Sequence, residues 1–213
     1  MTLDEQIMKL VDETHHANDS GFLAQLEALL SQGANPGQID GDMNSIFDKV
    51  ALQSADAQLP VDALRLLISY GAQLHANTLC SAVMLNKTER FLELLQLYDD
   101  LPEDILHCAF RWTDDPKLVV SALIERGMDI NAKDEEGNTP LHTLGYRDHP
   151  LAFELIEYAI SLGADLQIHN RQNQTARDTL STNDKQLFDV ALAGHALQDQ
   201  TRAAVQPTSR RAL

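Results

Sequence analysis

Four apolar segments of this chain end in the same way, with a glycine directly after the last apolar turn. They read LLSQGANP at 29–36, LLISYGAQL at 66–74, LIERGMDI at 123–130 and AISLGADL at 159–166. A glycine at this position closes a helix because it adopts a positive φ without the steric penalty of a Cβ atom. The glycines are Gly33, Gly71, Gly127 and Gly163, at intervals of 38, 56 and 36 residues. This recurrence predicts a helical repeat protein, with one degenerate unit inside the longest interval.

Each predicted unit restarts at a hydroxyl side chain. Twelve residues after three of these glycines stand Ser45, Thr139 and Thr175. A hydroxyl is a good helix N-cap, and a proline behind it suits the first helical position, where its missing N–H costs nothing. The fullest example of this start is Thr139, Pro140, Leu141 and His142. A glycine-capped helix followed by a turn and a T-P-L-H start resembles the ankyrin repeat, most closely over residues 123–180.

The resemblance implies an all-α fold, an ankyrin-like solenoid of about six helix–turn–helix repeats with hairpin loops between some of them. Residues 1–198 would form this array, and residues 199–213 would form a flexible basic tail. Stacking of neighbouring pairs would bury the apolar stripe that each second helix carries. The expected pairs span residues 3–31, 45–69, 78–98, 103–126, 139–162 and 175–197.

The same resemblance implies that the T-P-L-H motif is structural. Thr139 and His142 would hold a tight turn through hydrogen bonds, and Leu141 would pack between helices. The alternative is a catalytic or metal-binding His142. No Ser, Cys or paired carboxylate nearby supplies a nucleophile and an orienting group, and the chain has no HExxH or CxxC spacing. We therefore expect a non-enzymatic protein with no metal and no cofactor, and an enzyme with an unrecognised site is the competing class.

The spacing between units departs from the ankyrin pattern in three places. Only six residues separate Gly71 from Thr78, which predicts that the hairpin is missing there. The connection YDDLPED between the third and fourth pairs is also short, and the turn within the fifth pair is lengthened around residues 147–150. These changes indicate either a surface shaped for one partner or drift in a repeat that binds nothing.

The charge of the chain is strongly acidic. It has 16 Lys and Arg against 32 Asp and Glu, a net charge of −16. Nucleic-acid binding depends on neutralising phosphates with basic side chains, so nucleic acid and anionic membranes are poor partners for this chain. A partner protein with a basic face is favoured, although acidic surfaces also simply keep proteins soluble. We expect the chain to be monomeric when it is alone.

Two cysteines, Cys80 and Cys108, are too few for a disulfide framework. The N-terminal residues have no basic region followed by an apolar run, and no long apolar segment follows. These observations predict neither a signal peptide nor a membrane span. A reducing, cytoplasmic location is the simplest expectation.

The resemblance also implies where a partner would bind: at the hairpin tips, and at concave positions five and six residues after the signature leucine. Trp, Tyr and Arg dominate interface hot spots. The alternative is that Trp112 lies partly in the core and that Met84 and Leu85 line a helix interface. The expected binding residues are Met84, Leu85, Arg111, Trp112, Tyr146 and Arg147, with Glu135 and Glu136 on an acidic rim.

The sequence therefore predicts a protein–protein interaction module that covers, sequesters or inhibits one partner. An immunity or self-protection inhibitor of a toxin is one form of this function. An adaptor or a host-directed effector is another, and a self-associating structural unit is a third class.

Overall fold

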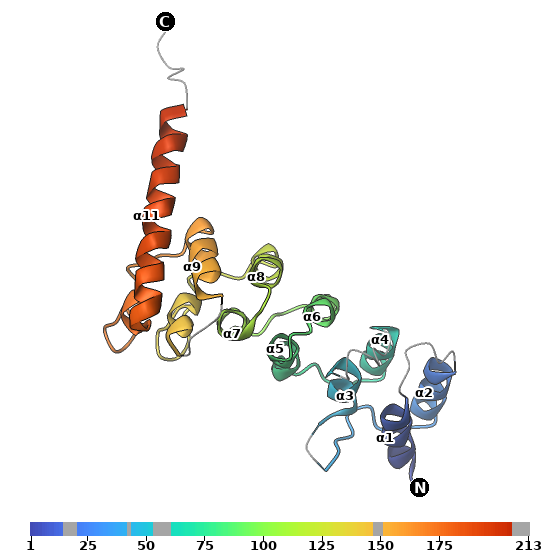
Figure 1. Ribbon diagram of the computed structural model, residues 1–213. Coiled ribbons are helices and arrows are strands. Elements are labelled where there is room, and N and C mark those ends of the chain that lie inside the picture. Colours follow the sequence, from blue (N-terminus) through green and yellow to red (C-terminus); the bar gives the residue numbers. More distant parts are fainter. Residues whose placement is uncertain (15–20, 42–43, 53–60, 147–150, 206–213) are drawn as a thin grey trace, which may run out of the picture. The chain divides into compact units, whose positions relative to one another are not determined.

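The computed structural model describes residues 1–14, 21–41, 44–52, 61–146 and 151–205 (Figure 1). Within these ranges the protein is all-α, and the only β pairing consists of two isolated antiparallel bridges, Ile39 with Ser45 and His169 with Thr175. The chain forms two compact units, Met1–Pro102 and Glu103–Leu213. The all-α fold of helix pairs expected from the sequence is confirmed.

In the described residues of the first unit there are three helix pairs. Helices of neighbouring pairs pack on one another: α1 on α3, α3 on α5 and α2 on α4. Fully buried side chains such as Ile7, Phe47, Leu64 and Phe91 fill the space between them. The helices are α1 (Leu3–Glu13), α2 (Phe22–Ser31), α3 (Ile46–Leu52), α4 (Val61–Ser69), α5 (Ala76–Met84) and α6 (Thr88–Leu95).

The described part of the second unit also has three pairs. They stack through the first helices (α7 on η2 on α10) and through the second helices (α8 on α9 on α11). Buried residues such as Leu106, Leu123, Leu141 and Leu155 form its core. The helices are α7 (Ile105–Trp112), α8 (Pro116–Glu125), η2 (Pro140–Tyr146), α9 (Ala152–Ser161), α10 (Ala176–Thr179) and α11 (Thr182–Val205).

The four helix-closing glycines have the backbone conformation that the sequence predicts. Gly33, Gly71, Gly127 and Gly163 have φ between 88° and 99°. The residue after each glycine donates its N–H back into the helix, for example from Ala34 to the carbonyl of Leu29 at 3.0 Å. This pair of features is the Schellman ending, which satisfies carbonyl groups in the last turn.

Two predicted helices differ from the expectation. The segment 139–146 is a 3-10 helix, Pro140–Tyr146, and not an α-helix. Its Gly145 packs so closely on α10 that a Cβ atom there would collide with the backbone carbonyl of Thr179. The last helix is longer than expected: α11 continues to Val205, so residues 199–205 are helical and not part of a flexible tail. The remainder of the predicted tail, 206–213, and the lengthened turn at 147–150 lie outside the described residues.

The connection between pairs two and three confirms the predicted loss of a hairpin, since α4 ends at Ser69 and α5 begins at Ala76. The retained hairpins share one arrangement, in which the side chain of the first residue accepts the backbone N–H four residues later. The pairs are Asp40 with Asn44, Asp134 with Asn138 and Asn170 with Gln174, at 2.8–3.0 Å.

Candidate functional site

His142 is buried and forms hydrogen bonds on both sides of its ring. Its Nδ1 accepts the backbone N–H of Thr139 at 3.1 Å, and the Thr139 hydroxyl lies 2.8 Å from the same atom. Nε2 therefore carries the proton and donates to the carbonyl of Gln174, 3.1 Å away in the next hairpin. Burial lowers the pKa of His142 below its usual value. The contact with Thr139 corresponds to the tight turn that the structural interpretation predicts. The contact with Gln174 also ties one repeat to the next.

His107 occupies the same position one repeat earlier, 35 residues before His142. Its Nε2 lies 2.8 Å from the carbonyl oxygen of Asn138, which repeats the contact between His142 and Gln174. Its Nδ1, however, is buried without a hydrogen-bond partner. The residue equivalent to Thr139 is Asp104, whose side chain does not cap the helix. The sequence interpretation missed this second histidine, although the spacing of ILH at 105–107 indicates it.

The partner-binding residues predicted in the second unit include a stacked pair. The guanidinium carbon of Arg111 lies 5.4 Å from the centroid of the Trp112 ring, at the C-terminal end of α7. Arg111 is exposed and Trp112 is half-buried. A cation over an indole face gains electrostatic attraction from the ring. The pair therefore presents a flat, amphipathic surface with a positive charge.

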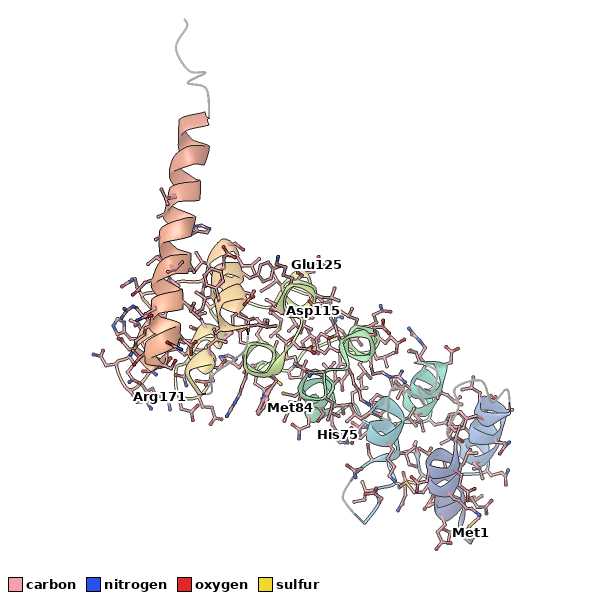
Figure 2. The ribbon with its side chains drawn as sticks, in the orientation of Figure 1. Met1, His75, Met84, Asp115, Glu125 and Arg171 are labelled. Carbon is pink, nitrogen blue, oxygen red and sulfur yellow. The ribbon has the colours of Figure 1, made fainter. Side chains whose placement is uncertain are left out.

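The other predicted binding residues fall into three groups. Met84 and Leu85 lie at the end of α5 in the first unit and are 48% and 54% exposed (Figure 2 labels Met84). The backbone of Tyr146 ends η2, and its side chain and all of Arg147 lie outside the described residues. Glu135 and Glu136 are exposed in the hairpin that begins at Asp134.

The hairpin that carries the two glutamates is held by its own neighbours. Asp134 accepts the backbone N–H groups of Glu136 and Asn138 at 3.0 and 2.8 Å. The carbonyl of Glu136 accepts the N–H of Arg171 in the following hairpin at 2.8 Å. Because the backbone is fixed in this way, the exposed carboxylates project from a defined surface.

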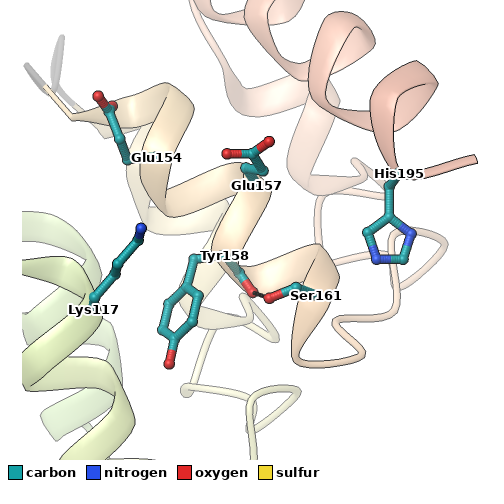
Figure 3. A pocket seen from close by; sticks show the side chains of 6 residues that line it. All are labelled: Lys117, Glu154, Glu157, Tyr158, Ser161 and His195. Atoms are coloured by element: carbon teal, nitrogen blue, oxygen red, sulfur yellow. Dashed lines mark hydrogen bonds between the residues drawn. The ribbon is translucent and has the colours of Figure 1, made fainter. Parts of the chain in front are cut away.

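A groove of about 420 Å³ lies in the second unit between α8, α9 and α11 (Figure 3). The Tyr158 hydroxyl lies 2.7 Å from Ser121 Oγ, and Ser161 donates to the Tyr158 carbonyl at 2.7 Å. One ammonium group, two carboxylates and an imidazole give the groove a mixed charge that suits polar side chains of a partner. It is lined by Lys117, Glu154, Glu157, Tyr158, Ser161 and His195.

Sequence interpretation missed this groove, although one signal for part of it is present. Positions 154, 157, 158 and 161 follow the i, i+3, i+4, i+7 spacing that places residues on one face of a helix. The contributions of α8 and α11 could not be predicted, since they depend on how the helices pack. Among the described residues, no cluster of three His, Cys, Asp or Glu side chains could hold a metal ion.

Comparison with known proteins identifies the repeat. The family model described as ankyrin repeats (many copies) matches residues 106–160. The match begins before the stretch 123–180 that most resembles the repeat in the sequence, so it includes His107, and it ends before that stretch does. Human protein fem-1 homolog C is 39% identical over 66 residues, covering 30% of this chain and 10% of that protein. The aligned part thus represents about a tenth of the length of that relative.

Solved structures show the same fold over most of the chain. EF0377, an ankyrin repeat protein, superposes with a TM-score of 0.62 at 16% identity, covering 91% of this chain and 98% of that chain. The ankyrin repeat domain of Bcl-3, a member of the IkappaB protein family, has a TM-score of 0.59 at 18% identity, covering 90% and 95%. Among the described helices, none combines the length and apolar character that a bilayer crossing requires.

Proposed function

We propose that this ankyrin-repeat protein, with its divergent repeats, binds one partner protein through the surface around Arg111 and Trp112. Ankyrin-repeat domains mediate protein–protein interaction, and the fold is a typical non-enzymatic scaffold. The observation that carries the proposal is the stacked pair at the end of α7, with an exposed guanidinium at 5.4 Å from a half-buried indole. Such residues combine large contact area with a polar group, which is characteristic of interface hot spots.

The acidic charge supports a partner with a basic face. The chain carries a net charge of −16, and Glu135 and Glu136 are exposed on a hairpin of the same unit as Arg111 and Trp112. Exposed charges at the edge of an interface accelerate encounter more than they stabilise the complex. The proposed mechanism is occupation: the protein covers a surface of its partner and thereby sequesters or inhibits it. An immunity or self-protection inhibitor fits this mechanism, and an adaptor or effector scaffold would use the same surface.

The cytoplasmic location inferred from the sequence remains a prediction. Neither Cys80 nor Cys108 is a free thiol in the structure, so the cysteines themselves do not argue for a reducing compartment.

Affinity capture from the native organism with mass spectrometry would identify the partner. The captured protein is then titrated against the purified chain and against Trp112→Ala. A central hot spot predicts that binding weakens by about 2 kcal/mol or more, roughly thirtyfold. A folded Trp112→Ala protein that binds normally would exclude this surface and favour the hairpin tips.

Charge reversal at Glu135 and Glu136 distinguishes electrostatic steering of association from direct contact within the complex. If these residues form a rim, association becomes slower and less sensitive to salt, while dissociation changes little. Charge reversal at Glu13, an exposed acid of the first unit, controls for the change in total charge and should slow association less.

A further inference from the structure

Helix α11 has one face packed on the array and one face that is not. Phe188 and Ala191 are 2% and 3% exposed, and this face lies against α9. The helix is 24 residues long, and Figure 1 shows that its distal half extends past α9. Isolated helices of this kind are only marginally stable in water, so most helical stability comes from packing.

A second apolar stripe runs along α11 beside the packed face. Leu187, Val190 and Leu197 are 38%, 60% and 64% exposed, and Gly194 lies between the last two. The intervals are three, four and three residues, which are those of the a and d positions of a heptad. Side chains at a and d positions pack between two helices. The partner that fits the stripe is therefore another helix.

The residues immediately flanking the stripe are uncharged. Its flanking residues Asn183, Gln186 and Ala193 are neutral. Lys185 stands two residues before Leu187, about 200° away around the helix. Asp189 is bound to Arg177 by hydrogen bonds of 2.7 and 2.8 Å. In a chain of net charge −16, a neutral face is where a second copy meets the least repulsion.

We propose that two copies of this protein pair through their α11 helices, antiparallel about a twofold axis near Gly194. A twofold axis packs the stripe of one chain against the same stripe of the other chain. Val190 of one chain then packs against Leu197 of the other. No atom lies within 4 Å of a Cβ position at Gly194, which leaves room for the helices to approach closely. A basic partner would find no carboxylate on this face, which favours the second copy as the occupant. This proposal differs from the sequence analysis, which expects a monomer.

The mass of the full chain, measured by sedimentation equilibrium across micromolar to millimolar concentrations, tests the proposal. The wild-type mass should rise from 23.6 kDa toward twice that value. Val190→Glu and Leu197→Glu should remain at 23.6 kDa throughout the same range. Leu192→Glu is the matched control: Leu192 is 42% exposed but lies about 200° from Val190, and this variant should dimerise like the wild type.

Helical content from circular dichroism confirms that each variant is folded, so loss of the dimer is not loss of structure. Added salt should preserve or strengthen the dimer, because it screens the repulsion between two acidic chains. A wild-type chain that stays monomeric at the highest concentration would overturn the proposal. So would a Leu197→Glu chain that dimerises normally, or a dimer that salt dissociates.

Discussion

The hydroxyl of Thr139 lies 2.8 Å from Nδ1 of His142, whereas Asp104 leaves the equivalent Nδ1 of His107 without a partner. Both imidazoles contact the carbonyl of the next hairpin through Nε2, at 2.8 and 3.1 Å. A buried acceptor without a donor loses its hydrogen bonds to water and forms none within the protein, which destabilises the fold. The fourth repeat therefore carries a defect that the fifth repeat does not.

Replacing Asp104 with Thr should repair this defect. The new hydroxyl can donate to Nδ1 of His107, and the free energy of unfolding should rise by about 0.5–1.5 kcal/mol. Urea unfolding measures the change. Asp104→Val has nearly the same shape without the hydroxyl, and it serves as the control; equal stability of the two variants would show that no hydrogen bond forms.

Gly145→Ala should destabilise the second unit by about 1–3 kcal/mol, as expected for overpacking. The added Cβ would collide with the Thr179 backbone carbonyl, which cannot rotate away as a side chain can. Thermal unfolding of the variant tests this. Gly41→Ala is the comparison, because no atom lies within 4 Å of a Cβ position there. A Gly145→Ala protein as stable as the wild type would show that η2 and α10 can separate at little cost.

His142 should make stability depend on pH. Burial lowers its pKa in the folded state below the usual value of 6.5, so the unfolded chain binds the proton more readily. The contribution of the neutral ring is complete above about pH 6.5 and is lost as pH falls through the folded-state pKa. Urea unfolding of the wild type and of His142→Gln, at pH 8 and pH 5.5, measures this. The stability advantage of the wild type should shrink at the lower pH; a constant difference would contradict the assignment.

Trp112→Ala should cost an intermediate amount of stability. The side chain is half-buried, so we expect a loss of about 1–2 kcal/mol, within the ordinary range for point substitutions. Phe110, on the same helix, is fully buried, and Phe110→Ala should cost about 3–5 kcal/mol. Denaturant titration of both variants gives the comparison. Equal losses would mean that Trp112 is a core residue and a poor candidate for a binding hot spot.

The sequence by itself determined the helix pairs and the turns that close them. Gly33, Gly71, Gly127 and Gly163 were predictable because positive φ is a local steric property of glycine. The same holds for Thr175, whose side chain accepts the N–H of Asp178 only three residues away. The T-P-L-H motif was recognisable because Thr139 and His142 contact each other within one turn.

Only the tertiary structure decided what these elements expose. The collision that excludes a Cβ at Gly145 and the groove beside Tyr158 depend on neighbours from other repeats. The burial of Trp112 and the free stripe of α11 have the same origin, since helical periodicity places a residue on a face without saying what covers it. Local steric rules act over a few residues, whereas burial is set by contacts between residues that are distant in the sequence.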